Sequence, residues 1–274
     1  MSESLSFDRV AEHYDATRGY PPGIAEAIAE AMARAGRLGP GSDALEIGIG
    51  TGRIALPLVA RGVNVFGVDI SPRMLDQLRQ KRAALATRAA PGSLGTLEVE
   101  VADMTALPFP DARFPAVIAV HVFHLVPGWL RALDEALRVL RPDGALLIGQ
   151  DVHSGPGATR MDSIEDRWRQ ILRELGYEQS TIGASGYDAV LAELERRGLR
   201  VEETTAARWE TQYTPRQALE TITSRLWSRT WTVPDELFAE SARRLTAWCE
   251  REFTGAMETP TPTPHAFKLT RATR

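Results

Sequence analysis

Short runs of apolar residues alternate with segments of helical character over the first 150 residues of the chain. The apolar runs cover residues 44–49, 63–70, 97–102, 116–122 and 145–148. Helix-favouring segments lie between them, at residues 53–61, 72–90 and 129–140. This alternation predicts an α/β fold with a parallel sheet and helices on both faces, because strands that are buried on both sides are apolar throughout.

The rest of the chain is predicted to be mostly helical. Two helices are expected before the alternating region, at residues 11–18 and 24–35, and four after it, at 162–175, 187–197, 215–226 and 235–253. Strands are expected at residues 201–209 and 265–272. The sequence at 141–144 predicts a turn, and the Thr-Pro repeat at 259–264 predicts an extended connector.

Composition and charge narrow the class of protein. A chain of 274 residues with 43% hydrophobic and 25% charged residues is ordinary for a globular protein. The net charge of −4 argues against a nucleic-acid partner. Cys249 is the only cysteine, which excludes an internal disulfide. With no signal peptide and no apolar run near the ~18 residues of a membrane span, we expect a cytoplasmic protein without a membrane partner.

Three alternating glycines follow the first apolar run. Gly48, Gly50 and Gly52 precede helix-favouring residues, and Asp69 ends the second apolar run. Glycines let the backbone approach a ligand closely, and an acid after the second strand suits ribose hydroxyls. The pattern therefore predicts a site for an adenosine-containing cofactor. Arg53 occupies the third glycine position of the dinucleotide fingerprint, which argues against a nicotinamide cofactor.

Five motifs in this order resemble the class I S-adenosylmethionine-dependent methyltransferases, in particular the small-molecule branch that includes the ubiquinone-biosynthesis type. They lie at residues 45–52, 67–75, 101–109, 114–118 and 137–144. The resemblance implies a Rossmann-like sheet in a single methyltransferase domain over residues 1–274. It implies a cofactor-binding core at 7–150 and helical cap insertions at 155–183 and 211–260. S-adenosyl-L-methionine would be the cofactor and S-adenosyl-L-homocysteine the product.

The resemblance also implies a set of cofactor-binding residues. They are Tyr14, Arg18, Glu46, Gly48, Gly50, Gly52, Asp69, Ile70, Met74, Asp103, Met104 and His121. Asp69 would accept the ribose hydroxyls, Ile70 and Met74 would flank the adenine, and Asp103 would accept its amino group. Local alternatives remain open, since Asp69 is also a candidate helix cap, although Ser71 is a better one. Asp103 is equally compatible with a simple turn.

Methyl transfer requires an aligned nucleophile and exclusion of water, and it requires a base only when the acceptor is protonated. His121 and His153 follow the fourth and fifth strands, so they are the candidate catalytic bases, with His121 the closer by resemblance. Hydrogen bonding to a loop explains each histidine equally well. Asp151 and His153 lack a convincing third ligand, so no metal is expected.

The later helices are candidates for binding the acceptor. Arg225, Trp227 and Arg229 lie in the second insertion, and the two arginines share a face only if the helix continues that far. Solvent exposure and a homodimer interface are the alternatives for this segment. We expect a small-molecule acceptor whose methylated atom is O, N or C.

Three other functions compete with methyl transfer. The first is that of a non-catalytic S-adenosylmethionine-binding regulator or partner subunit, which the apparently complete set of cofactor motifs disfavours. A nicotinamide-dependent oxidoreductase is disfavoured by Arg53 and by the acid at position 103. A nucleic-acid methyltransferase is disfavoured by the acidic charge balance and by the absence of an N-P-P-Y motif.

Overall fold

A computed structural model describes residues 6–8, 11 and 14–274 of the chain, which divides into two compact units. The first unit takes in the described residues up to Asp151, together with Thr181–Ala207 and Phe267–Arg274. The second unit consists of Val152–Ser180 and Arg208–Ala266. Residues 1–5 lie outside the described residues. The predicted absence of a signal peptide concerns this segment.

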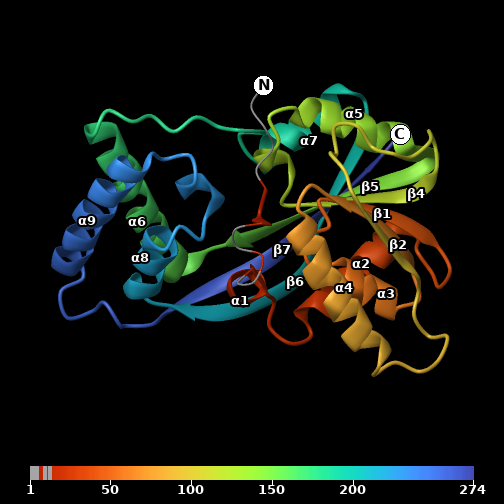
Figure 1. Cartoon of the computed structure of the whole chain (residues 1–274), viewed down its shortest axis with the longest axis horizontal. Coiled ribbons are helices and arrows are strands. Elements are labelled where there is room, and N and C mark those ends of the chain that lie inside the picture. Colours follow the sequence, from red (N-terminus) through yellow and green to blue (C-terminus); the bar gives the residue numbers. More distant parts are fainter. Residues whose placement is uncertain (1–5, 9–10, 12–13) are drawn as a thin grey trace. The chain divides into compact units, whose positions relative to one another are not determined.

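In the part of the chain that the structure describes, seven strands form one sheet in the order β3-β2-β1-β4-β5-β7-β6. The strands are β1 (Asp43–Ile47), β2 (Asn64–Asp69), β3 (Leu97–Val101), β4 (Phe114–Val120), β5 (Leu140–His153), β6 (Arg200–Tyr213) and β7 (Thr261–Thr273). From β3 to β5, neighbouring strands pair in parallel. β7 runs in the opposite direction to β5 (Figure 1). The predicted α/β class is confirmed, but the sheet is mixed rather than wholly parallel.

Helices cover both faces of the sheet in the first unit (Figure 1). One face carries α2 (Ile24–Gly36), α3 (Ala55–Ala60) and α4 (Pro72–Ala86), and the other carries α5 (Trp129–Val139) and α7 (Tyr187–Arg196). On the second face, Val117 of β4 belongs to one buried cluster with Leu133 of α5 and Leu194 of α7. This burial from two sides explains the continuous apolar character of the central strands.

The boundary of β5 differs from the prediction. β5 begins at Leu140 rather than at residue 145, because Leu140 already pairs with Phe114. The next pair joins Ala116 to Ala145, so the four residues 141–144 lie opposite the single residue Pro115. The predicted turn at these positions is therefore a bulge inside a strand rather than a connection before one.

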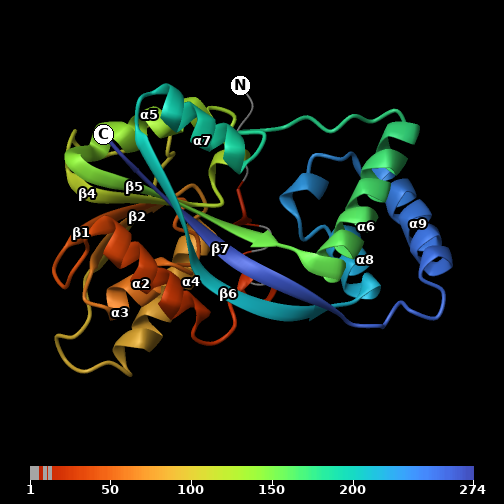
Figure 2. The ribbon, with the colours of Figure 1, turned by 180° about the vertical axis from the view of Figure 1, so that it is seen from behind.

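The helices of the second unit pack on one another. They are α6 (Gly155–Glu174), α8 (Pro215–Thr223) and α9 (Asp235–Glu252), which lie side by side (Figure 2). Trp168, Leu219 and Leu245 contribute to their shared buried core. Three predicted boundaries are wrong here: α6 starts at residue 155 rather than 162, α8 ends before residue 226, and most of the Thr-Pro connector belongs to β7.

The N-terminal helix is described only in part. α1 (Tyr14–Arg18) covers the end of the helix predicted at residues 11–18, and residues 12 and 13 lie outside the described residues. Over the part of the chain that the structure describes, no helix is long and apolar enough to cross a membrane.

Candidate cofactor and catalytic site

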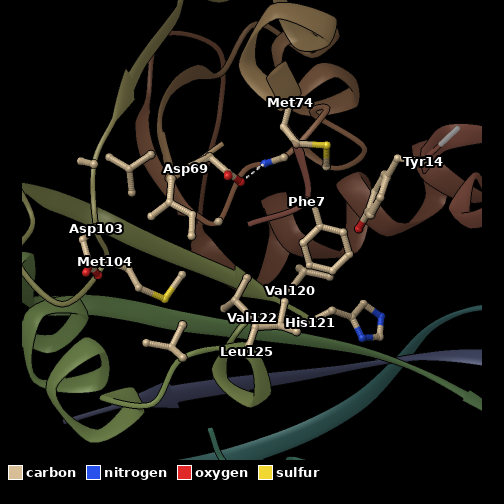
Figure 3. A pocket seen from close by; sticks show the side chains of 16 residues that line it. Phe7, Tyr14, Asp69, Met74, Asp103, Met104, Val120, His121, Val122 and Leu125 are labelled. Atoms are coloured by element: carbon tan, nitrogen blue, oxygen red, sulfur yellow. Dashed lines mark hydrogen bonds between the residues drawn. The ribbon is translucent and has the colours of Figure 1, made fainter. Parts of the chain in front are cut away.

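A pocket of about 610 Å³, including its open mouth, lies within the first unit (Figure 3). Most of its polar lining follows the carboxyl ends of β1 to β4, where open parallel sheets bind their ligands. Nine predicted cofactor-binding residues line it: Tyr14, Gly48, Gly50, Asp69, Ile70, Met74, Asp103, Met104 and His121. The other three, Arg18, Glu46 and Gly52, lie outside the lining.

The glycines of the loop after β1 do not share one role. Gly50 lines the pocket with a φ of 55°, and a Cβ there would lie 3.3 Å from the Cε of Met74. Gly52 also has a positive φ, of 78°, but a Cβ there would lie 2.2 Å from Leu78 Cδ1 on α4. Gly50 therefore keeps the pocket open, while Gly52 lets the loop pack against a helix.

Asp69 lies at the end of β2 with its carboxylate in the pocket lining. Its Oδ2 accepts a hydrogen bond from the Gly50 amide at 2.8 Å, and its Oδ1 accepts one from the Ser71 amide at 2.8 Å. Burial raises the pKa of Asp69, and these two amides oppose that effect. A carboxylate has about four acceptor sites, so both oxygens retain capacity for the hydroxyls of a ligand.

Ser71, rather than Asp69, caps the following helix. The Ser71 Oγ accepts a hydrogen bond from the Met74 amide at 3.1 Å, and Pro72 occupies the first helical position. The capping preference predicted from the sequence is confirmed. As a result, the Asp69 carboxylate is not needed as the cap of α4.

Glu46 is buried in β1, behind the glycine loop. Its Oε2 has no hydrogen-bond partner among the described residues. Burial raises the pKa of Glu46 to about 8, although the charge of Arg53 and the Ala55 amide act in the opposite direction. Ala55 is the first residue of α3, so Glu46 contacts the point where the glycine loop joins this helix.

The N-terminal segment is tied to the glycine loop and to α4. Asp15 accepts hydrogen bonds from the Thr51 hydroxyl at 2.6 Å and from the Lys81 ammonium at 2.7 Å. These bonds hold α1 beside the pocket, where Tyr14 and Phe7 are part of the lining with perpendicular rings 5.6 Å apart. Asp15 is not predicted from the sequence, because no motif marks its position.

Asp103 lies at the end of the pocket opposite His121 (Figure 3). Its Oδ1 accepts a hydrogen bond from the Thr105 amide at 2.8 Å, so it does cap a local turn. The same residue lines the pocket next to Met104, which is buried. The two alternatives considered for Asp103, a turn residue and a pocket residue, are therefore compatible.

His121 follows β4 and contacts a carboxylate from the next strand. Its Nε2 lies 3.0 Å from Oδ2 of Asp151, which is near the end of β5. The Tyr20 hydroxyl donates to the same carboxylate at 3.1 and 3.2 Å, and the Arg53 guanidinium lies 3.7 Å from it. From the sequence, Asp151 is a candidate only as a metal ligand. In residues 6–8, 11 and 14–274, no cluster of acidic, histidine or cysteine side chains could hold a metal ion.

His153 belongs to the second unit. Its Nε2 lies 3.4 Å from Oδ1 of Asp162 on α6, and its ring neighbours that of His265 at 6.2 Å. Of the two histidines predicted as bases, the pocket lining includes His121 and not His153.

The predicted acceptor-binding residues have partners within the second unit. Arg225 Nη1 donates to Asp235 at 2.8 Å, and its guanidinium lies 4.0 Å above the ring of Phe238. Arg229 donates to Glu165. Trp227 packs against the core of the helices.

The two arginines do not share a helical face. α8 ends at Thr223, and Arg225 has a φ of 53°, which terminates the helix. The expectation that the helix reaches residue 226 is therefore wrong, and with it the condition for a joint arginine face.

Comparison with known proteins identifies the region around the pocket. Residues 45–148 match the methyltransferase domain family. The chain is 38% identical over 144 residues to an uncharacterized methyltransferase of Mycobacterium tuberculosis, covering 52% of this chain and 51% of that protein. It is 35% identical over 124 residues to the demethylmenaquinone methyltransferase of Deinococcus radiodurans, covering 44% and 46% of the two chains.

A solved structure of similar fold extends the comparison beyond this region. The YcgJ protein of Bacillus subtilis superposes with a TM-score of 0.56 at 16% identity, covering 90% of this chain and 98% of that chain. At this level of identity the likeness shows the fold alone. The chain spans about half the length of the curated relatives it matches.

Proposed function

We propose that this chain is a class I S-adenosylmethionine-dependent methyltransferase that methylates a small-molecule acceptor, and the match of residues 45–148 to the methyltransferase domain family supports this. S-adenosylmethionine is the cofactor of this family. The observation that carries the proposal is that Gly50, Asp69, Asp103 and His121 line the same pocket. Adenosine recognition and a candidate base are thus combined in one cavity.

The residues of the pocket fit an S-adenosyl group. Asp69 retains acceptor capacity for ribose hydroxyls, and Gly50 leaves space that a side chain would occupy. Met74 and Met104 supply apolar surface for a purine ring. The bound cofactor supplies a methyl carbon that its sulfonium has already activated. The protein therefore has to bind, orient and exclude water.

The proposal includes the chemical nature of the methyl acceptor. The name of one relative, demethylmenaquinone methyltransferase, supports a small-molecule acceptor. We assign acceptor recognition to the second unit, whose segments correspond to the predicted insertions. The aromatic content of this unit, which includes the partly buried Trp227, favours an apolar or aromatic acceptor.

Two measurements test the proposed function. Calorimetry should show binding of S-adenosylhomocysteine and no binding of NAD. Incubation with S-adenosylmethionine carrying a labelled methyl group and a metabolite extract should then transfer the label to a small molecule. Binding without any transfer would favour a non-catalytic cofactor-binding protein, and binding of NAD alone would refute the proposal.

A further inference from the structure

His121 is held in an unusual backbone conformation at the edge of the pocket. It follows the last residue of β4 with a φ of 54°, in the left-handed region that side chains other than glycine rarely adopt. Its amide still donates to the Gly149 carbonyl of β5 at 3.3 Å. Such a conformation persists only where the surroundings hold it, and it is most frequent at functional sites.

Two groups of Asp151 compete for the same ring nitrogen. The Nε2 of His121 lies 3.0 Å from the Asp151 Oδ2 and 3.1 Å from the Asp151 amide nitrogen. A neutral imidazole nitrogen either donates or accepts, so it cannot bond to both. If Nε2 carries the hydrogen, it donates to the carboxylate. If Nε2 is bare, it accepts from the amide and its lone pair faces a carboxylate oxygen.

The surroundings of Asp151 keep its carboxylate ionised. Burial acts to raise its pKa, but the bond to His121, the charge of Arg53 and the Tyr20 hydroxyl together lower it. Burial also raises the pKa of Tyr20, which therefore remains a neutral donor to Asp151. An ionised oxygen 3.0 Å from a bare nitrogen is repulsive, whereas the charge-assisted bond from Nε2–H is among the stronger hydrogen bonds.

Arg53 and Tyr20 hold each other in place behind this carboxylate. The guanidinium carbon of Arg53 lies 4.6 Å from the centre of the Tyr20 ring, and its Nη1 donates to the Arg18 carbonyl at 2.7 Å. The carboxyl group of Glu46 is a further neighbour of Arg53. Tyr20 and Arg53 therefore act on His121 through Asp151.

We infer that Asp151, held by Tyr20 and Arg53, is a positioning residue that keeps the hydrogen of the neutral His121 on Nε2 and leaves Nδ1 as the proton acceptor. This inference rests on the proposed function, and it identifies Nδ1 of His121 as the atom that accepts the proton from the methyl acceptor. For an acceptor with an ionisable X–H bond, the proton passes to Nδ1 as X bonds the methyl carbon, and the electron pair of the broken carbon–sulfur bond stays on sulfur. The imidazolium that results keeps its Nε2–H on the Asp151 carboxylate.

The tautomer of His121 can be measured without knowing the acceptor. Protein with ¹⁵N-labelled histidine is saturated with S-adenosylhomocysteine, and long-range proton–nitrogen correlation spectra distinguish protonated from bare ring nitrogens. The chain has five histidines, and His121→Gln identifies the signals of His121 by their loss. We expect Nε2 protonated and Nδ1 bare in the wild type at a pH where the ring is neutral.

Asp151→Asn tests the positioning role directly. The variant should reduce the ratio of the Nε2–H to the Nδ1–H form by about tenfold, because one charge-assisted bond is lost and the amide of residue 151 can then donate to a bare Nε2. Tyr20→Phe should produce a smaller shift in the same direction, and it provides the test if Asp151→Asn does not fold. Asp162→Asn, which removes the carboxylate beside His153, is the matched control and should leave the His121 signals unchanged.

Two results would overturn the inference. The first is a wild-type His121 protonated on Nδ1, and the second is a tautomer ratio that neither Asp151→Asn nor Tyr20→Phe changes. Failure of the proposed function has a different signature. In that case S-adenosylhomocysteine does not bind in calorimetry, or it binds but no label is transferred to a small molecule, while the tautomer is still measurable in the protein alone.

Discussion

Two acidic side chains at the pocket of the first unit and two among the helices of the second unit serve different purposes. In the first unit, Asp69 lines the pocket with acceptor capacity left over, and Asp151 bonds a pocket histidine. In the second unit, Glu165 bonds both Arg169 and Arg229, and Asp235 bonds Arg225. Charge that is directed at a cavity is available to a ligand, whereas charge paired with a neighbour stabilises the fold by a small amount. The contrast predicts where substitutions affect binding and where they affect stability alone.

The largest expected effect concerns the pH dependence of stability and comes from Glu46. Its pKa is raised from 4.5 to about 8 in the folded protein. Between these pH values the unfolded chain loses this proton while the native state keeps it, so the carboxyl lowers stability as pH rises. The shift corresponds to at most roughly 5 kcal/mol. Relative to wild type, Glu46→Gln should therefore become progressively more stable from about pH 4.5 to pH 8.

Urea unfolding of both proteins across this pH range measures the difference. Glu98→Gln, on the edge strand β3, is the control for removal of one carboxyl from an exposed position. Parallel curves for wild type and Glu46→Gln would show that the buried carboxyl is ionised in the folded protein.

The next largest effect is expected at Gly50. Gly50→Val should weaken S-adenosylhomocysteine binding by a factor of about 100 or more, or about 3 kcal/mol, because the new side chain occupies space beside Met74 in the pocket. Gly52→Val is the matched control, since a valine side chain at this position would collide with Leu78 rather than enter the pocket. It should mainly lower the melting temperature.

Calorimetry and thermal melting of both variants separate the two roles. If Gly52→Val weakened binding as strongly as Gly50→Val in a folded protein, the loop would act as one unit. The distinction between a pocket glycine and a packing glycine would then be wrong.

Substitution of Asp69 should have a smaller effect, and this effect should be on ligand binding. Asp69→Asn should weaken S-adenosylhomocysteine binding by roughly 10–100-fold, about 1.5–3 kcal/mol, because charge-assisted bonds to the ligand become neutral ones. Asp43→Asn is the control in the same sheet, since Asp43 starts β1 and bonds Arg113 at 2.8 Å. Equal affinities for wild type and Asp69→Asn would show that Asp69 orders the loop and does not bind the ligand.

The parts of the site that the sequence predicts are those defined by local spacing. Gly50 lies two residues beyond Gly48 on one turn, and Asp69 ends the adjacent strand, so the order of elements is enough to bring them together. Parallel pairing then brings the ends of β2 and β4 to the same edge as β1. The sheet and its helices follow from the same alternation of apolar and helical segments.

The parts that the sequence does not predict depend on contacts between distant residues. Tyr20 and Asp151 are 131 positions apart, and neither stands in a motif that indicates the other. Only the packed β4–β5 edge brings His121 and Asp151 together. For Arg225 and Arg229 of the second unit the limit of prediction is of the opposite kind. Their charge suggested ligand binding, but the sequence does not show which residues pair with them. Asp235 and Glu165, their partners in the fold, are 10 and 64 positions away.

The smallest effects are expected at these arginines. Arg225→Ala should lower the free energy of unfolding by about 1 kcal/mol, because it removes a cation–π contact with Phe238 and a hydrogen bond to Asp235. Arg229→Ala should cost less than about 0.5 kcal/mol, since the Arg229 side chain is 57% exposed and its ion pair is at the surface. Neither variant should change the affinity for S-adenosylhomocysteine. If both kept full stability and instead raised the Michaelis constant of an identified acceptor, the arginines of the second unit would be ligand-binding residues, and the contrast between the two units would fail.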